Sequence, residues 1–274
     1  MRAQEKHSAD HRHHPGRRRP PRRVTVASVR PLTPRLVSIL LTGEDLAGFS
    51  TGDPTSHIKV FFPPEGGAEP ILPAWGPDGP IRSADGPRPV SRTYTPVRFD
   101  AASRTLEVQF LLHGDGPASR WAANAQVGDR IAVAGPGGRF DVTPDVPRWW
   151  IAGDESAIPA ITTLLRELDP ASTAEVHIEV GDATDELSIT DHLGVTVHWH
   201  QRPAPDAFGT ELISAALEAS VAGDTGIWVG CEAASMRRIR RHFLDAGIDR
   251  RRLTTRGYWR QGTPNHPDHD HGDD

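Results

Sequence analysis

Hydrophobic and polar positions alternate with a short period in the first half of the chain. Val24, Val26 and Val29 begin the pattern, and five stretches rich in β-branched and aromatic residues follow. Gly, Pro and Asp turns separate these stretches, which lie at residues 35–43, 57–63, 91–99, 106–113 and 130–136. Short strands divided by such turns are typical of a β-barrel. The pattern predicts an antiparallel barrel over residues 24–146, interrupted by a helix at 117–125 that has Pro117 in its first turn.

From residue 147 the pattern changes to apolar strands that alternate with amphipathic helices. Helical periodicity covers residues 157–168, 210–221 and 234–247. Strand-like runs separate or flank these helices at residues 148–153, 175–180, 194–200, 226–230 and 253–259. Such alternation predicts an α/β domain over residues 147–262, with a parallel sheet and helices on both faces.

Three segments do not fit either pattern. Residues 66–89 are long and rich in Pro and Gly, which predicts a surface excursion from the barrel. Residues 1–23 hold 8 Lys/Arg against 2 Asp/Glu and predict a disordered basic arm, with contact to RNA or an acidic surface as the alternative. Residues 263–274 predict a disordered acidic, His-rich tail, in which metal binding would be adventitious.

Composition narrows the classes of function. Hydrophobic residues make up 36% of the chain, and no run of about 18 apolar residues predicts a membrane span. Residues 24–262 carry a net charge of −7, which argues against wrapping nucleic acid. The single cysteine, Cys231, excludes an internal disulfide, a CxxC redox pair and a cysteine-ligated iron–sulfur cluster. Redox chemistry would therefore need a borrowed cofactor, and we expect a cytoplasmic protein.

A flavin site is suggested by two short segments of the predicted barrel. In an extended strand, Arg92 and Tyr94 point to one face and Thr95 to the other, so a flavin across the strand end could contact all three. The segment 116-GPAS-119 opens the predicted helix and offers backbone N–H groups and the Ser119 hydroxyl to a pyrophosphate. Each segment alone also fits an amphipathic strand or an ordinary helix cap. Their order, one strand apart, favours the flavin.

The same segments resemble a known family. The pair 92-RTYT-95 and 116-GPAS-119 resembles the two flavin signatures of the ferredoxin–NADP reductase superfamily. The longer runs 110-FLLHGDGPASRWA-122, 151-IAGDESAIPAI-161 and 258-YWRQG-262 resemble the siderophore-interacting protein family of ferric-siderophore reductases. The resemblance spans roughly residues 24–262. It implies FAD at the barrel, a nicotinamide-binding second domain, and an iron chelate as the electron acceptor.

The resemblance also implies which barrel residues contact FAD. His113 would face the flavin, although a turn histidine bonded to its own loop is the alternative. In the family a second arginine follows the threonine by two residues; here that position is Val97, and Arg98 comes next. The expected FAD contacts are Arg92, Tyr94, Thr95, Leu112, His113, Gly116, Pro117, Ala118 and Ser119.

In the second domain the resemblance, rather than a G-x-G-x-x-G motif, supplies the NADPH or NADH site. Asp154, Glu155 and Ser156 follow the first strand of this domain, where α/β sheets bind ligands, and Ser156 fits a helix cap equally well. Arg237 is expected to read an NADP 2′-phosphate, or else to be a solvated surface charge. Tyr258 and Trp259 would return to line the flavin ring, with packing of the last strand as the alternative.

Two cations are candidates for binding the acceptor. Lys59 is one of only two lysines, against 29 arginines, and Arg260 follows the aromatic pair. An anionic ferric chelate would favour positive charge beside the flavin. A plain surface charge is the alternative for each. No metal ligand set is predicted.

These observations predict an FAD-dependent ferric-siderophore reductase that passes electrons from NAD(P)H through FAD to chelated Fe(III). Reduction releases the metal because hard oxygen donors hold Fe(II) more weakly. The alternatives are a general NAD(P)H flavin reductase or diaphorase, and a non-catalytic FAD-bearing siderophore carrier or sensor. The expected partner is a ferric siderophore, with ferredoxin as an alternative donor, and the expected state is a monomer.

Overall fold

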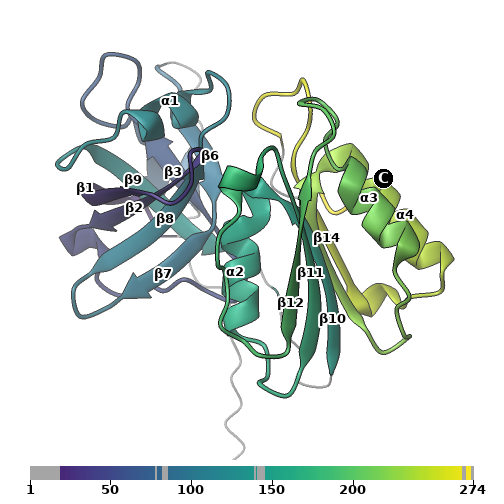
Figure 1. Cartoon of the computed structure of the whole chain (residues 1–274). Helices are drawn as coiled ribbons and strands as arrows, with labels where there is room; N and C mark the ends of the chain where they lie inside the picture. The colour runs from purple at the N-terminus through teal and green to yellow at the C-terminus, as the bar shows by residue number, and fades with distance from the viewer. Residues whose placement is uncertain are drawn as a thin grey trace, which may run out of the picture.

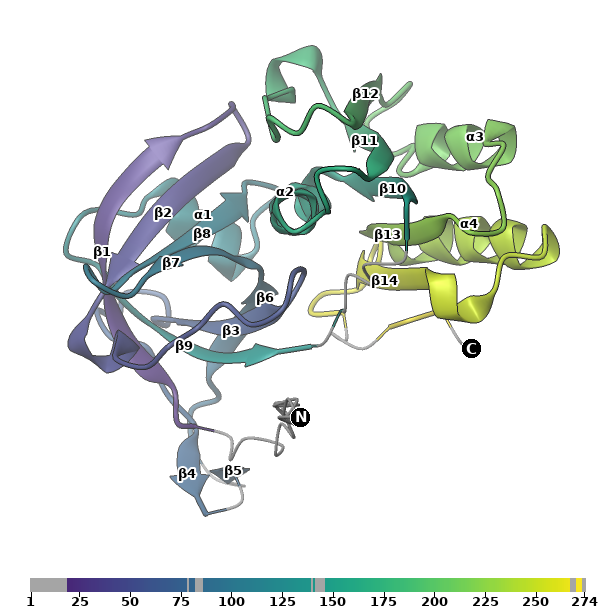
Figure 2. The same ribbon diagram turned by 90° about the horizontal axis from the view of Figure 1, so that it is seen from below.

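The N-terminal half is a strongly curved antiparallel sheet. A computed structural model of the chain describes residues 19–77, 79–81, 86–138, 140, 146–266 and 270–272. The seven strands of this sheet run in the order β6-β3-β9-β1-β2-β8-β7, and Figure 2 shows them coiled into a barrel. Their bounds are β1 Arg22–Pro31, β2 Leu36–Thr42, β3 His57–Phe62, β6 Val90–Tyr94, β7 Pro96–Asp100, β8 Thr105–Leu111 and β9 Arg130–Gly137. The prediction of an antiparallel barrel is confirmed.

Alternation of side chains builds the barrel core. In β8 the even positions Leu106, Val108 and Phe110 are fully buried, while the residues between them are half-buried. Short additions complete the domain: the 3-10 helix η1 (Glu44–Leu46), and α1 (Pro117–Ala123), which has Pro117 at its start. The excursion between β3 and β6 contains a small two-stranded ribbon, β4 (Ala74–Gly76) and β5 (Gly79–Ile81), which the sequence pattern did not predict.

The C-terminal half is a parallel sheet covered by helices on both faces (Figure 1). The strand order is β12-β11-β10-β13-β14, so the first strand of the domain, β10, lies in the centre. Every pair in this sheet is parallel, as predicted. The strands are β10 Arg148–Asp154, β11 Thr173–Val180, β12 Val195–Gln201, β13 Gly226–Glu232 and β14 Leu253–Trp259; the helices are α2 Ile158–Arg166, α3 Thr210–Glu218 and α4 Ala233–Asp245, with short 3-10 turns η2 Glu155–Ala157, η3 Ala183–Asp185 and η4 Arg250–Arg252.

Helix α2 lies between the parallel sheet and the barrel, while α3 and α4 cover the far face of the sheet (Figures 1 and 2). Leu36 of the barrel belongs to the same buried cluster as the apolar side of α2. Hydrogen bonds also cross this boundary: Arg166 Nη1 donates to the Val97 carbonyl at 3.0 Å, and the Thr55 N–H donates to Thr163 Oγ1 at 3.0 Å. The two halves therefore share a packed interface, in addition to having cores of their own.

Val97 and Arg98, where the chain departs from the family pattern, lie at a register irregularity. The pairing of β7 with β8 shifts between Pro96 and Arg98. Val97 is buried, and its carbonyl is the acceptor for Arg166, whereas Arg98 is exposed. Because Val97 is the extra residue at this irregularity, Val97 lies buried and Arg98 lies exposed.

Candidate functional site

On the barrel side, the open N-terminus of α1 is the best candidate for binding an anion. Gly116 is the N-cap residue, and among the described residues the helix has no side-chain cap hydrogen bond. A Cβ added at Gly114 or Gly116 would meet nothing within 4 Å, so the space before the helix is open. The buried Ser119 Oγ accepts a hydrogen bond from the His113 N–H at 2.9 Å, which ties the end of β8 to the helix. Backbone N–H groups at such a terminus favour a phosphate.

The side chains of β6 and of the β8–α1 loop meet near this helix. Arg92 Nη1 donates to the Ser91 carbonyl at 2.8 Å. Burial, and then the positive charge of Arg92, lowers the pKa of His113, so its imidazole is neutral at neutral pH. Tyr94 packs its ring against Phe110 with centroids 4.4 Å apart, and burial raises the pKa of its phenol.

These barrel residues fit FAD. An uncapped helix N-terminus with open space before it suits the pyrophosphate, and Arg92 adds positive charge on the neighbouring strand. Among the other predicted contacts, Thr95 and Ala118 are buried, and the Leu112 N–H donates to the Arg35 carbonyl at 2.7 Å. Arg92, Ser119 and the first-turn N–H groups of α1 would hold the diphosphate, and Tyr94, Thr95 and His113 would lie toward the ring.

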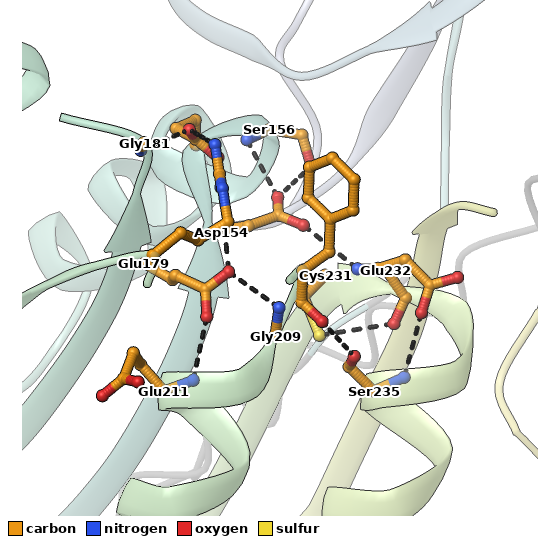
Figure 3. Close-up of polar contacts among 12 residues, drawn as sticks. Asp154, Ser156, Glu179, Gly181, Gly209, Glu211, Cys231, Glu232 and Ser235 are labelled. Carbon is orange, nitrogen blue, oxygen red and sulfur yellow. Dashed lines mark hydrogen bonds and ion pairs between the residues drawn. The ribbon is translucent and has the colours of Figure 1, made fainter. Parts of the chain in front are cut away.

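The carboxyl edge of the parallel sheet is arranged differently (Figure 3). Three parallel strands each end in a buried carboxylate that accepts hydrogen bonds from backbone N–H groups at the start of a helix. Asp154 accepts from Ser156, ahead of α2; Glu179 accepts from Gly209 and Glu211, at α3; and Glu232 accepts from Ala234 and Ser235, at α4. At the η2 turn that leads into α2, and at the starts of α3 and α4, a carboxylate of this chain therefore already accepts from the N–H groups that a pyrophosphate would use.

Asp154 has partners on both of its oxygens. Oδ1 accepts from the N–H of Ser156 at 3.0 Å and from the Ser156 hydroxyl. Oδ2 accepts from the Glu232 N–H at 3.0 Å and from the indole Nε1–H of Trp259 at 2.8 Å. Burial, and then the neighbouring charge of Glu155, raises the pKa of Asp154 to about 6, although these hydrogen bonds oppose the rise.

Glu155 is held by two arginines. Arg202 forms two hydrogen bonds with its carboxylate, at 2.6 and 2.8 Å, and Arg35 of the barrel lies 3.1 Å away. The N–H of Gly181 donates to the same carboxylate at 2.9 Å. A Cβ added at Gly181, the residue after β11, would lie within 3 Å of both guanidinium groups, so a larger residue there would displace the two arginines from this arrangement. Glu155 thus lies within an ion-pair network that joins the two domains.

Tyr258 and Trp259, the two aromatic residues at the end of β14, lie in different surroundings. The register with β13 shifts so that Cys231 lies opposite Gly257 and Glu232 opposite Trp259, which leaves Tyr258 as an extra residue. Tyr258 packs edge-on against Trp228, with centroids 6.2 Å apart, and burial raises its pKa. Trp259 instead lies at the carboxyl edge of the sheet, edge-on to Phe208.

Cys231 and Arg237 lie on the β13–α4 side of this edge. The Cys231 thiol is fully buried, and burial raises its pKa well above the ordinary value, so it is protonated. Arg237 forms an ion pair with Asp270 at 2.8 Å, and Asp270 also lies 2.8 Å from His266 Nε2. The predicted 2′-phosphate reader therefore has a carboxylate partner from the segment predicted to be disordered.

The two predicted acceptor-binding cations lie on different domains. Lys59, exposed on β3, pairs in register with Thr93 of β6 and Ala134 of β9. Arg260 is exposed just after β14. The sequence analysis missed a third cation, Arg256. Its Nε is buried with no hydrogen-bond partner among the residues that the structure describes, and its Nη2 lies 3.8 Å from a Cβ placed at Gly138 of the barrel. Its position two residues before Tyr258 on the last strand was the available signal.

The sequence analysis also missed the network around Glu155. Its members come from segments without a recognisable motif. Arg35 is 150 positions from Asp185, and Arg202 is 47 positions from Glu155; Glu179 also belongs to the network. Within the described residues, no group of three or more His, Cys, Asp or Glu side chains is arranged to hold a metal ion. No helix in the same part of the chain is long and apolar enough to cross a membrane.

The sequence of this chain is similar to known protein families and to named reductases. The family model described as "Siderophore-interacting FAD-binding domain" matches residues 25–140, and that described as "Siderophore-interacting protein" matches residues 146–262. The ferric vibriobactin reductase ViuB of Vibrio cholerae is 32% identical over 249 residues, which cover 83% of this chain and 84% of that protein. The NADPH-dependent ferric-chelate reductase of Escherichia coli is 33% identical over 245 residues, covering 87% and 92%.

Solved structures agree with the sequence matches. A siderophore utilization protein from T. fusca superposes with a TM-score of 0.83 at 35% identity, covering 91% of this chain and 96% of that one. The siderophore-interacting protein SipS from Aeromonas hydrophila gives a TM-score of 0.75 at 28% identity, covering 89% and 93%.

Proposed function

Because the chain belongs to the siderophore-interacting protein family, we propose that it is an FAD-dependent ferric-siderophore reductase that takes electrons from NADPH or NADH. One structural observation supports this function most directly. The barrel has a helix N-terminus without a side-chain cap among the described residues, beside Arg92, whereas in the parallel-sheet domain carboxylates of this chain already accept from the N–H groups at the starts of η2, α3 and α4. The barrel is therefore the half suited to a tightly held diphosphate.

Bound FAD would supply the redox chemistry, accepting two electrons from the nicotinamide and delivering single electrons to Fe(III). The residues of this chain would bind the FAD and orient it and the electron donor. Arg92, Ser119 and the amides of α1 would hold the diphosphate, and the neutral His113 would contribute a hydrogen bond without adding charge. Trp259 and Asp154 would form the donor side of the site, at the carboxyl edge of the sheet.

For the acceptor, we propose that Lys59, Arg256 and Arg260 provide positive charge toward an anionic ferric chelate. Lys59 and Arg260 are exposed, and Arg256 comes close to the barrel at Gly138. Positive potential attracts such a chelate, and it favours the reduced, more negative product. Fe(II) then leaves hard oxygen donors more readily than Fe(III) does. Release in the cytoplasm, a monomeric state, and ferredoxin as an alternative donor belong to the same proposal.

The test is anaerobic turnover in two steps. NADPH is added to the FAD-loaded protein, and the loss of flavin absorbance is followed. A ferric siderophore is then added with a chromogenic Fe(II) chelator. We expect the flavin to be reduced, then reoxidised as Fe(II) appears, and faster than with free FAD at the same concentration.

Two results would contradict the proposal. A protein that stays oxidised with NADPH, NADH and reduced ferredoxin would be a carrier or sensor and not a reductase. Equal rates for ferric siderophores and for unrelated electron acceptors would instead indicate a general diaphorase.

A further inference from the structure

Asp154 and Trp259 are 105 positions apart and meet at the edge of the sheet where the donor is expected to bind. Trp259 is the last residue of β14, and the extra residue in the β13–β14 register places its indole above the strand ends. One edge of the indole contacts the Phe208 ring, with centroids 4.7 Å apart and planes at 89°. Within the described part of the chain, the indole N–H donates to Asp154 Oδ2 at 2.8 Å. The contact with Phe208 and the hydrogen bond to Asp154 together set the orientation of this ring.

The hydrogen-bonding capacity of Asp154 is already used by groups of the protein itself. Its two oxygens accept four hydrogen bonds, from the N–H and hydroxyl of Ser156, the Glu232 N–H and the Trp259 indole. A buried carboxylate with four donors has little capacity left for a dinucleotide. Negative charge beside it would also repel the phosphates of NADPH. Direct binding of the donor is therefore a poor explanation for Asp154.

We propose that Asp154 is a positioning residue, which holds the indole of Trp259 over the donor site while its carboxylate is ionised and loosens that hold when it is protonated. This inference rests on the proposed function for its effect on turnover, but not for the hydrogen bond itself.

The surroundings of Asp154 make its protonation accessible near neutral pH. The side chain is almost fully buried, and burial together with the charge of Glu155 raises its pKa to about 6. Most of the other ionisable groups that face it are acidic or uncharged. The acidic or uncharged groups are Glu179 on β11, Cys231 and Glu232 on β13, and Tyr258 on β14. The positively charged group is the guanidinium of Arg202, after β12.

The geometry indicates where the proton would go. Oδ2 faces two N–H donors that cannot turn away, from Glu232 and Trp259. Oδ1 faces one N–H donor, that of Ser156, together with the Ser156 hydroxyl, and the hydroxyl can rotate to accept instead of donate. A proton on Oδ1 leaves Oδ2 as the oxygen of a neutral acid. The bond to Trp259 then loses its charge assistance and roughly half its strength.

The direct test follows the indole N–H of Trp259 by nuclear magnetic resonance. Of the seven tryptophan indole signals, that of Trp259 is assigned by its loss in Trp259→Phe. In the FAD-loaded wild type we expect this signal to shift as the pH falls from about 7.5 to about 5, with a midpoint close to the pKa of Asp154. In Asp154→Asn it should not titrate. A Trp259 signal that stays constant in the folded wild type over this range would overturn the inference.

A second measurement connects the bond to the reaction. The rate of flavin reduction by NADPH, measured anaerobically in single turnovers, should fall about threefold to tenfold from pH 7.5 to 5 in the wild type if a bond of this kind positions the ring. Asp154→Asn should resemble the low-pH wild type at every pH. In Trp259→Phe the rate of flavin reduction should no longer depend on pH. The double variant Trp259→Phe/Asp154→Asn should reduce the flavin at nearly the same rate as Trp259→Phe alone.

Ser156→Ala serves as the matched control. It removes a hydrogen bond to Oδ1 and leaves the Oδ2–Trp259 bond in place, so the titration should persist with a higher midpoint. A wild type that NADPH does not reduce at any pH would refute the proposed function, while the resonance titration would still decide the role of Asp154. A titration in the resonance without any pH dependence of flavin reduction would refute the positioning role.

Discussion

Arg35, the residue before strand β2 of the barrel, lies 2.6 Å from the carboxylate of Asp185 in the other domain. Asp185 also accepts from the Thr33 hydroxyl at 2.9 Å, and the same guanidinium reaches Glu155 at 3.1 Å. Both carboxylates are almost completely buried, whereas Arg35 is 37% exposed. One arginine therefore joins the flavin-binding half to two acidic turns of the parallel-sheet half.

We expect Arg35→Met to destabilise the protein by about 1–3 kcal/mol. Removing one partner of a fully buried pair costs about 3–5 kcal/mol, and the exposure of Arg35 reduces that amount. Unfolding in urea, followed by far-UV circular dichroism, measures the difference. Arg23→Met is the control, because its partner Glu69 and Arg23 are 45% and 59% exposed, so this surface pair should contribute about 0–1 kcal/mol. Equal effects in the two variants would contradict the role of the interdomain pair.

Arg92→Ala should lower the affinity for FAD about tenfold or more. A hydrogen bond to a charged group is worth about 1.5–3 kcal/mol, and the variant removes it from the expected diphosphate site. Titration of the apoprotein with FAD, followed by quenching of flavin fluorescence, gives the dissociation constant. Arg98→Ala tests the neighbouring exposed arginine and should leave the affinity unchanged. If the effects are reversed, Arg98 takes the place of the family's second arginine.

The pairing of Arg237 with Asp270 predicts competition for a 2′-phosphate. If Arg237 reads that group, Asp270→Asn removes the ion pair that competes with it, and the KM for NADPH should decrease relative to that for NADH. Arg237→Ala should raise the KM for NADPH and leave that for NADH unchanged. Steady-state rates with both donors measure the ratio. An unchanged ratio in both variants would show that the ion pair only attaches the C-terminal segment to α4.

Lys59→Ala and Arg260→Ala should each weaken reduction of an anionic ferric chelate while sparing FAD content and flavin reduction by NADPH. The loss should be larger for a highly charged chelate than for a neutral one. It should also shrink with added salt, because exposed charges are screened over about 8–10 Å at physiological ionic strength. The assay compares both chelates at two salt concentrations. Equal losses for the two chelates, or none, would exclude a docking role.

His177 should make the protein less stable in mild acid. Burial, followed by the charges of His198 and His200, lowers its pKa to about 4 from an ordinary value of 6.5. Between these values the unfolded chain binds a proton that the folded chain does not, so stability falls as the pH drops from about 6.5 toward 4. His177→Gln should reduce this fall. Urea unfolding at pH 7.5 and at pH 5 measures the loss of unfolding free energy in the wild type and in the variant. An equal loss in both would exclude His177 as the source of the acid sensitivity.

Local patterns in the sequence were sufficient for the architecture. Period-two alternation, as in Leu106, Val108 and Phe110, marks a strand with one buried face, and this depends only on neighbouring residues. Buried strands alternating with helices such as 158–166 permit few arrangements besides a parallel sheet. The proposed flavin contacts also lie in two short segments, which is why sequence motifs could propose them.

The tertiary structure alone decided how distant charges are paired. Arg35 meets Asp185 across 150 positions and Trp259 meets Asp154 across 105, and neither pair belongs to a local motif. The sequence showed 153-GDES-156 as a helix start. It did not show that the Asp154 carboxylate itself accepts from the Ser156 N–H there, where a phosphate was expected. Nor could a period of two predict the extra residue that separates Tyr258 from Trp259. The physical reason is that packing of whole elements sets these distances, and the sequence near each residue carries no information about its partner.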